Sequence, residues 1–324
     1  MINVGAGNIQ MIKVGSEDAS KAYQGSTLVW TAEEPIYTAL TCEYLVTVTG
    51  ETKIANTMGS LCTDMVVDGQ QVEASNYYEF TTTGKHVVEW HIAENPSIVP
   101  VSSFYDVACL DVVHLPATTT YIHMYAFNHC TGLTKCDMSG TAISAINSGA
   151  FQGCESLKEI VLPPATRIWS NAFDGCHSVT SITFNDALTR IDNYAFREVG
   201  EMMHGSHDIV LIMPSGLTYM GEAAFAHVKT DVIELNEGLE TIGPEAFFGA
   251  DESSIDIPST VTSIGYDAFG QCPLMDIKFK GSTPPTFDGD PFMYDHLTRI
   301  VVPSGSLAAY QAALPSYASI MVEY

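Results

Sequence analysis

The chain has 324 residues, of which 46% are apolar, so it can bury a substantial core and is not a disordered tail. Its 13 Lys and Arg against 38 Asp and Glu give a formal net charge of -25, which excludes nucleic acid and anionic membranes as partners because like charges repel. Charged residues make up only 16% of the chain, below the roughly 25% of an ordinary domain, and this favours a mainly β fold with short helical turns.

Residues 1–31 are expected to form a small β anchor module. Alternating runs at 11–14, 19–23 and 27–30 are separated by turn residues, which is typical of short strands. About thirty residues cannot build an adequate core alone, so we expect this module to dock on a partner through five side chains: Ile12, Val14, Tyr23, Leu28 and Trp30. The sequence from 12 to 30 resembles a module at the start of virion proteins from phages of Bacteroides-type gut bacteria, which implies other virion proteins as partners. An ordinary β-hairpin is the alternative interpretation.

Residues 32–96 are expected to form a small Ig-like β-sandwich. Alternating runs lie at 45–49, 65–69 and 87–92, and Asp68-Gly69 is a favourable hairpin turn. The run from 78 to 90 resembles an immunoglobulin-like spacer of the kind that precedes repeat arrays. That resemblance implies a structural role, in which the domain holds the following array away from the anchor.

Phenylalanine recurs at a nearly constant interval through the rest of the chain. The intervals are 22–24 residues, apart from one of 29, and seven of the nine phenylalanines follow an alanine. The positions are Phe104, Phe127, Phe151, Phe173, Phe196, Phe225, Phe247, Phe269 and Phe292. A period of this length is the signature of a solenoid, in which each unit completes the apolar core of its neighbours. The nine rings should therefore lie in one column.

Each unit combines an alternating run, a central aliphatic residue and the Ala-Phe pair. In the unit at 157–173, Ile160 and Leu162 should point inward from one strand, which Pro163 ends. The cadence Ile-x-Leu-Pro, Ile-Gly and Ala-Phe-x-x-Cys, whose second half is clearest at 264–272, resembles the BspA-like class of leucine-rich repeat. That resemblance covers about residues 97–302 and implies a leucine-rich-repeat solenoid with an adhesive rather than a catalytic role. Residues 303–324 resemble the closing helix of that family and are expected to form a C-terminal helical cap.

Eight cysteines are too few, in a chain of this length, to indicate a disulfide scaffold. Four of them stand three residues after a column phenylalanine, which indicates a repeated buried position rather than pairing: Cys130, Cys154, Cys176 and Cys272. We expect free thiols that pack as small apolar side chains.

The sequence carries no motif of a known catalytic site, and we expect no enzyme activity, no cofactor and no bound metal. The Gly-x-Ser-x-Gly elbow, His-Glu-x-x-His, Cys-x-x-Cys and the phosphate-binding loop are missing. His204, His207 and Asp208 form the densest cluster of metal-binding side chains. Gly205-Ser206 leaves the two imidazoles unconstrained and no cysteine is nearby, so we interpret the cluster as a solvated loop.

Strand alternation predicts one outward-facing residue between each pair of inward-facing ones. Across the array, these positions form a ladder of candidate ligand-binding residues: His114, Asp137, Val161, Thr183, Ile212, Glu234, Asp256, Lys278 and Val301. The middle of the ladder is less polar than its C-terminal part, and exposed apolar residues beside acidic ones indicate a recognition patch. The alternative is a set of ordinary solvated strand residues.

Three functions fit these features. The leading hypothesis is a noncatalytic phage virion protein, anchored by residues 1–31, whose repeats recognise a glycan or protein of the host surface. No leader with a basic and an apolar region precedes Lys13, and no run of about 18 apolar residues follows. Synthesis in a host cytoplasm would reconcile a missing signal with free thiols. The alternatives are a BspA-like adhesin of a bacterial cell surface and a glycan depolymerase, and a homo-oligomer is compatible with each.

Overall fold

The computed structural model describes the backbone of residues 21–24 and 27–31, and the side chains as well in 39–93, 97–138, 140–200, 209–230, 232–293 and 297–324. The chain divides into two compact units, residues 1–38 and 39–324. In the first unit, β1 (Lys21–Gln24) and β2 (Thr27–Thr31) form an antiparallel hairpin, as the runs at 19–23 and 27–30 predict. Ile12 and Val14 lie outside the described residues. The docking role of the anchor, including Tyr23, Leu28 and Trp30, therefore stays a prediction.

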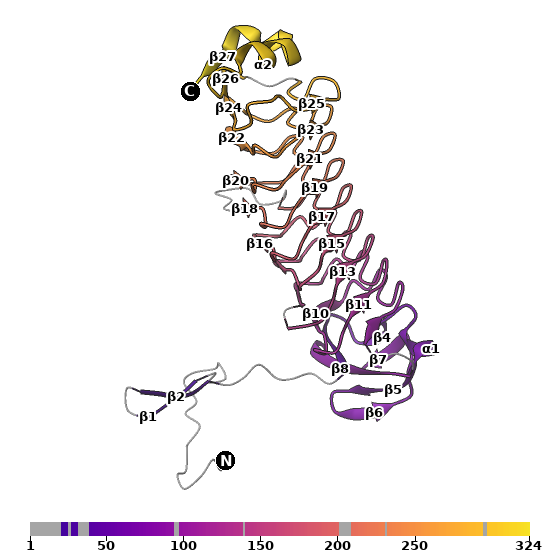
Figure 1. Cartoon of the computed structure of the whole chain (residues 1–324). Coiled ribbons are helices and arrows are strands. Elements are labelled where there is room, and N and C mark those ends of the chain that lie inside the picture. Colours follow the sequence, from indigo (N-terminus) through magenta and orange to yellow (C-terminus); the bar gives the residue numbers. More distant parts are fainter. Residues whose placement is uncertain are drawn as a thin grey trace. The chain divides into compact units, whose positions relative to one another are not determined.

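The second unit is a solenoid whose coils supply strands to two parallel arrays (Figure 1). One array is a continuous nine-stranded sheet of β9 (Ile98–Val99), β11 (Tyr121–Ile122), β13 (Ala145–Ile146), β15 (Arg167–Ile168), β17 (Arg190–Ile191), β19 (Tyr219–Met220), β21 (Thr241–Ile242), β23 (Ser263–Ile264) and β25 (Thr286–Phe287). The other array contains β10 (Leu110–His114), β12 (Lys135–Asp137), β14 (Glu159–Val161), β16 (Ser181–Thr183), β18 (Val210–Ile212), β20 (Val232–Glu234), β22 (Ser254–Ile257), β24 (Asp276–Phe279) and β26 (Arg299–Val302). We call the outward side of this second array the ladder face.

Nine phenylalanine rings form one column inside the solenoid, as the sequence period predicts. Adjacent ring centroids lie 5.0–5.9 Å apart with interplanar angles of 2–26°. Each ring is at most 1% exposed. The backbone couples the same coils, because the Phe173 N–H donates to the carbonyl of Ala195 in the next coil at 2.8 Å, and the pattern recurs along the column.

The corner that carries each ring from Phe104 to Phe269 depends on two residues in the left-handed backbone region, one two positions before the phenylalanine and one two positions after it. Around Phe196 these residues are Tyr194 and Glu198, each with φ of 60°. Other coils use glycine there, as at Gly153 and Gly175, because glycine adopts this conformation without steric cost. The corner geometry, rather than a helix, therefore turns the Ala-Phe pair inward.

All eight cysteines are free in the structure, as predicted, and the four that follow the column phenylalanines are buried. Each of these four thiols donates to the carbonyl of a phenylalanine one coil earlier, for example Cys130 to Phe104 at 2.9 Å and Cys272 to Phe247 at 3.0 Å. Burial raises the pKa of Cys130 to about 12, because the thiolate would be poorly solvated. The cysteines therefore serve as small core residues.

The sandwich expected over 32–96 is not confirmed as a separate domain. Four of its strands join two solenoid strands in one six-stranded sheet of order β12-β10-β3-β8-β5-β6, with β3 (Leu40–Val46), β5 (Cys62–Val67), β6 (Gln70–Val72) and β8 (Gly84–Ile92). The other elements are β4 (Gly50–Lys53), which pairs with β7 (Tyr77–Phe80), and the short α1 (Met58–Leu61). The Asp68-Gly69 hairpin is present between β5 and β6.

The physical reason for the difference is that this segment and the solenoid share one core. Trp90 on β8 is 1% exposed, and its ring centroid lies 6.1 Å from that of Phe104, the first ring of the column. A first coil without this contact would leave its apolar face in water. Residues 39–93 therefore close the N-terminal end of the solenoid.

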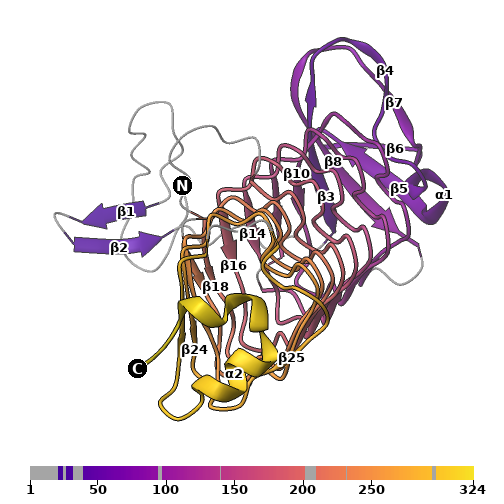
Figure 2. The ribbon, with the colours of Figure 1, turned by 90° about the horizontal axis from the view of Figure 1, so that it is seen from above.

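The C-terminal end carries the predicted helical cap, built from α2 (Leu307–Ala313) and the 3-10 helix η1 (Pro315–Ile320) (Figure 2). Tyr310 on α2 is fully buried, lies 5.0 Å from Phe279 between ring centroids, and donates its hydroxyl to the Gly281 carbonyl at 2.8 Å. The cap also includes a strand that was not predicted, β27 (Met321–Glu323), which pairs in parallel with β26. No helix in the described part of the chain has the length and apolarity needed to cross a membrane.

Candidate functional site

The structure places the nine predicted ladder residues at outward positions on the ladder face. The strand partners in register are His114 with Asp137, Val161 with Thr183, Ile212 with Glu234, and Asp256 with Lys278, which is also opposite Val301. The strand residue directly before each ladder residue points inward. Ile160, before Val161, and Ile255, before Asp256, are both buried. The alternation therefore located this row correctly, and its role in binding stays a prediction.

A second outward row lies two positions earlier on each strand and was not predicted: Val112, Lys135, Glu159, Ser181, Val210, Val232, Ser254, Asp276 and Arg299. The same period of two residues would have identified it. This row widens the ladder face and adds charged groups at both of its ends. The centre is apolar, with Val210 43% and Ile212 57% exposed on the same strand.

Two hollows lie over the C-terminal part of the ladder face. The larger, of about 600 Å³, is lined by Glu234, Glu252, Ser253, Ser254, Asp256 and Lys280, among others, and we call it the acidic hollow. The smaller, of about 380 Å³, is lined by Ser254, Asp256, Asp276, Lys278, Arg299 and Val301, among others, and we call it the mixed-charge hollow. Asp256 and Ser254 line both, so the two hollows adjoin. Of the predicted ladder residues, the structure thus brings four to these hollows: Glu234, Asp256, Lys278 and Val301.

Among the described strands, the acidic hollow lies at one of the three places where neighbouring ladder strands are not paired. β18 and β20 form one two-stranded sheet, while β22 begins the next sheet. The Glu252 carboxylate, which is 8% exposed, stands between them and accepts hydrogen bonds from the N–H groups of Ile233 at 3.0 Å, Ser253 at 2.9 Å and Ser254 at 3.1 Å. Because a side chain replaces the strand-to-strand bonds here, the break is a stable feature of the fold.

The charged groups of the hollows differ in how far they are already paired. Arg299 donates two hydrogen bonds to Asp276, at 2.9 and 3.0 Å, and Lys280 lies 3.5 Å from Asp256. Lys278 faces the Tyr324 ring, with its Nζ 4.3 Å from the centroid. Within the described residues, no ion pair or side-chain hydrogen bond engages the Glu234 carboxylate. Glu234 is therefore the group most available to a ligand.

The opposite end of the ladder is occupied by contacts within the protein. Glu43 accepts a hydrogen bond from His114 at 2.8 Å, and Lys85 lies 3.6 Å from Glu43 and 3.2 Å from Asp111. His114 and Asp137 therefore belong to the junction with the N-terminal sheet rather than to a hollow.

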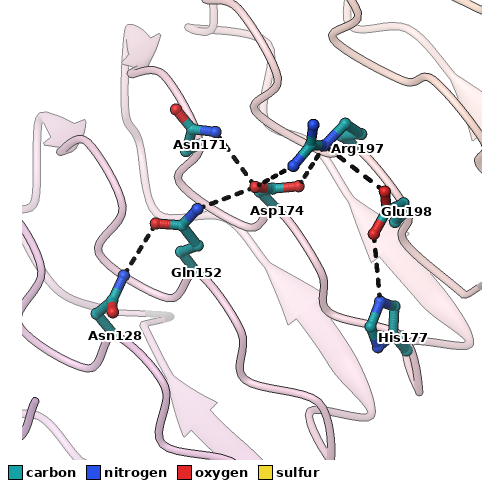
Figure 3. A network of polar contacts seen from close by, with 7 residues as sticks. All are labelled: Asn128, Gln152, Asn171, Asp174, His177, Arg197 and Glu198. Atoms are coloured by element: carbon teal, nitrogen blue, oxygen red, sulfur yellow. Dashed lines mark hydrogen bonds and ion pairs between the residues drawn. The ribbon is translucent and has the colours of Figure 1, made fainter. Parts of the chain in front are cut away.

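A polar network centred on the buried Asp174 lies at the phenylalanine corners (Figure 3). Asp174, which is 3% exposed, accepts two hydrogen bonds from Arg197 at 2.8 and 3.0 Å. It also accepts one from Gln152 at 3.0 Å and one from Asn171 at 3.2 Å, so one carboxylate joins three coils. This saturation indicates a structural role, because few of its lone pairs remain for a ligand.

His204, His207 and Asp208 lie outside the described residues, so their interpretation stays a prediction. Elsewhere in the described ranges, no three His, Cys, Asp or Glu side chains are arranged to hold a metal ion.

Comparison with known proteins identifies the repeats. The family model of the BspA type leucine rich repeat region matches residues 76–202 and 208–313, in six copies. No curated protein matches the sequence. Among solved structures, a leucine-rich repeat protein of Bacteroides ovatus ATCC 8483 is 19% identical over 69% of this chain and 61% of its own, with a TM-score of 0.49.

Two further solved structures are similar to parts of this chain. A leucine rich cell surface protein from Faecalibacterium prausnitzii A2-165 is 27% identical over 56% of this chain and 44% of its own, with a TM-score of 0.38. The pneumococcal vaccine antigen PcpA is 15% identical over 70% of this chain and 83% of its own, with a TM-score of 0.28. This chain thus spans 61% and 44% of the length of the first two structures.

The family match begins at residue 76, so it does not include the segment that resembles a virion module, and no comparison supports that resemblance. The match covers most of the solenoid, from its N-terminal closing sheet to α2. The column of rings, the buried cysteines and the two strand arrays agree with it. The chain belongs to the BspA-type leucine-rich repeat family.

Proposed function

We propose that this chain is a noncatalytic binding protein of a bacterial cell surface and that its ladder face holds a glycan or protein of another cell. Proteins of this family are typically found on bacterial cell surfaces, which supports the adhesin interpretation over the virion one. The observation that carries the proposal is the pair of adjoining hollows, which share Asp256 on a rigid face of stacked strands.

The chemistry of the hollows suits a polar ligand. Volumes of about 600 and 380 Å³ fall in the range of sites that hold small molecules. Carboxylates, ammonium groups and serine hydroxyls together provide acceptors and donors for sugar hydroxyls or for polar side chains of a protein. The strands that carry these groups are fixed by the column, so little conformational entropy is lost on binding.

A binding assay on intact cells tests this proposal. Fluorescently labelled full-length protein is titrated onto bacterial and epithelial cells, and onto the same cells after treatment with periodate or protease. Saturable binding is expected, and the treatment that removes it assigns the ligand as a glycan or a protein. Replacing both Glu234 by Gln and Asp256 by Asn should weaken binding about tenfold or more, because two hydrogen bonds to charged groups are lost.

The matched control is the double variant Glu79→Gln and Glu240→Gln, which changes net charge equally at exposed acids outside the hollows. It should bind like the unchanged protein. Equal losses of affinity in the two double variants would refute a role for the hollows. So would a result in which the protein binds saturably to none of the cell types.

A further inference from the structure

Arginine is concentrated in one part of the solenoid. The chain has four arginines, and three lie in two neighbouring coils: Arg167, Arg190 and Arg197. Arg167 on β15 and Arg190 on β17 are partners in register on the nine-stranded sheet, so both point outward from the array that does not carry the ladder face. Arg197 already donates two hydrogen bonds to Asp174 at the phenylalanine corner.

Arg167 and Arg190 share a single buried carboxylate. Asp192, which is 5% exposed, accepts hydrogen bonds from Arg167 Nε at 2.9 Å and from Arg190 Nε at 2.7 Å, and the second Arg167 nitrogen lies 2.7 Å away. Two guanidinium groups against one carboxylate leave net positive charge at this point of a strongly acidic chain. The site can therefore attract one more carboxylate.

Two aromatic rings hold the guanidinium groups in place. The Arg167 Cζ lies 3.7 Å from the centroid of Trp169, and the Arg190 Cζ lies 3.7 Å from the centroid of Tyr219. Ring contact and ion pair together fix each group, so a ligand meets donors that are already oriented. The Arg190 side chain is 40% exposed, and its two terminal amino groups have no acceptor among the described residues. The four N–H groups of these two nitrogens thus have no hydrogen-bond partner among the described residues.

The surroundings favour a sugar over a simple anion. Trp169 is 37% exposed and offers an apolar surface of the kind that packs against the C–H face of a pyranose ring. Thr241 and Ser263 continue the row beyond Tyr219 in register and supply hydroxyl groups. A net charge of -25 opposes any polyanion at a distance, but screening over about 8 Å at physiological salt permits contact with an isolated carboxylate.

We propose that Arg167, Trp169, Arg190 and Tyr219 form a second binding site, which takes a carboxylate-bearing sugar of a cell-surface glycan. The site goes beyond the proposed function because it lies on the other strand array and names its ligand class. The carboxylate pairs with Arg190 while the sugar ring packs against Trp169.

Calorimetric titration of the full chain tests the site with four probes. Hyaluronan tetrasaccharide and 3′-sialyllactose carry carboxylates, whereas tetra-N-acetylchitotetraose and lactose are their neutral counterparts. The acidic sugars should bind with dissociation constants of about 1 mM or lower, and the neutral ones at least about tenfold more weakly. Comparing the two acidic probes distinguishes a uronic acid from a sialic acid as the preferred unit.

Variants assign the binding to these residues. Arg190→Gln should weaken the acidic sugars about tenfold or more, and Arg190→Lys, which keeps the charge but loses the planar fork, should weaken them severalfold. The matched control Lys229→Gln removes a cation that pairs with Asp251 at 2.8 Å, outside both strand arrays and both hollows, and it should leave binding unchanged. Circular dichroism checks that each variant is folded.

Several results would overturn the proposal. These are no saturable binding of either acidic sugar, equal binding of the neutral sugars, or equal losses of affinity in Arg190→Gln and Lys229→Gln. Binding of a triglutamate peptide as tight as that of the acidic sugars would reject the sugar assignment. The Glu234→Gln, Asp256→Asn variant should retain the acidic-sugar affinity, so failure of the ladder-face proposal and failure of this one are distinguishable.

Discussion

Phe247 and Phe248 are neighbours in one corner, and they allow the ring column to be tested with a matched pair of substitutions. Phe247 is fully buried between Phe225 and Phe269, with centroid distances of 5.7 and 5.6 Å. Phe248 points outward, is partly exposed, and makes one edge contact with His227 at 5.4 Å. The two side chains are therefore chemically identical and adjacent in sequence, and they differ in burial.

Phe247→Ala should lower the free energy of unfolding by about 3–5 kcal/mol, because it leaves a ring-sized cavity in the core. Phe247→Leu keeps most of the volume but loses two stacked contacts of about 0.5–1.5 kcal/mol each, so it should cost about 1–3 kcal/mol. Phe248→Ala should cost about 1 kcal/mol or less.

Guanidinium unfolding followed by circular dichroism measures these differences, provided that the variants share one m-value. Hydrogen exchange should quicken first in the coils of β19, β21 and β23, because each coil contacts only its neighbours. Equal costs for Phe247→Ala and Phe248→Ala, within about 0.5 kcal/mol, would refute the stacked column as the source of stability.

Three further predictions concern buried polar groups. Native protein should react with iodoacetamide far more slowly than unfolded protein at pH 8, because burial raises the pKa of thiols such as Cys62 and Cys130, each to about 12. Mass spectrometry counts the modified thiols. Rapid labelling of Cys130 would contradict its burial. Burial, with Glu245 and Asp290 nearby, raises the pKa of Asp267, so the folded state holds this proton more tightly and stability should fall as pH rises through that pKa. Asp267→Asn should therefore withstand more denaturant than the unchanged protein at pH 7, with the advantage disappearing below about pH 4, and an advantage that persists there would exclude titration of this group. Asp174→Asn should lower the free energy of unfolding, measured with denaturant, by about 1–3 kcal/mol, because Arg197 loses a charged partner. An unchanged free energy of unfolding would show that the network in Figure 3 adds no stability.

The repeat could be predicted because its signals are local. Phe173 and its counterparts recur at a fixed interval, and Ile160 with Leu162 shows the alternation of a strand, so the column and the first ladder row follow from spacing alone. The second row, which includes Ser254 and Arg299, was within reach of the same reasoning.

Features that depend on long-range pairing could not be predicted. The alternating runs of β3 and β8 indicate strands, but nothing local shows that β3 pairs with β10 of the solenoid or that Trp90 packs on Phe104. The acidic hollow depends on three hydrogen bonds of Glu252, a residue without a motif.

The arginines show how little a short local sequence says about the strand array on which a residue lies. The tripeptide Thr-Arg-Ile occurs at 166–168, 189–191 and 298–300. The first two place Arg167 and Arg190 on the nine-stranded sheet, whereas the third places Arg299 on the ladder face. The tripeptide alone therefore does not decide the site, and its position within the repeat assigns Arg299 to the ladder face and the other two arginines to the nine-stranded sheet.

Carboxylate footprinting of the cell-bound protein tests the ladder face most directly. Exposed acids are modified with a carbodiimide and glycine amide, and mass spectrometry compares free protein with protein bound to cells. We expect modification of Glu234 and Asp256 to fall severalfold on binding, while that of Glu79 and Glu240 stays constant. Unchanged modification of Glu234 and Asp256 in protein that is saturably bound would show that the ligand lies elsewhere and would contradict the account.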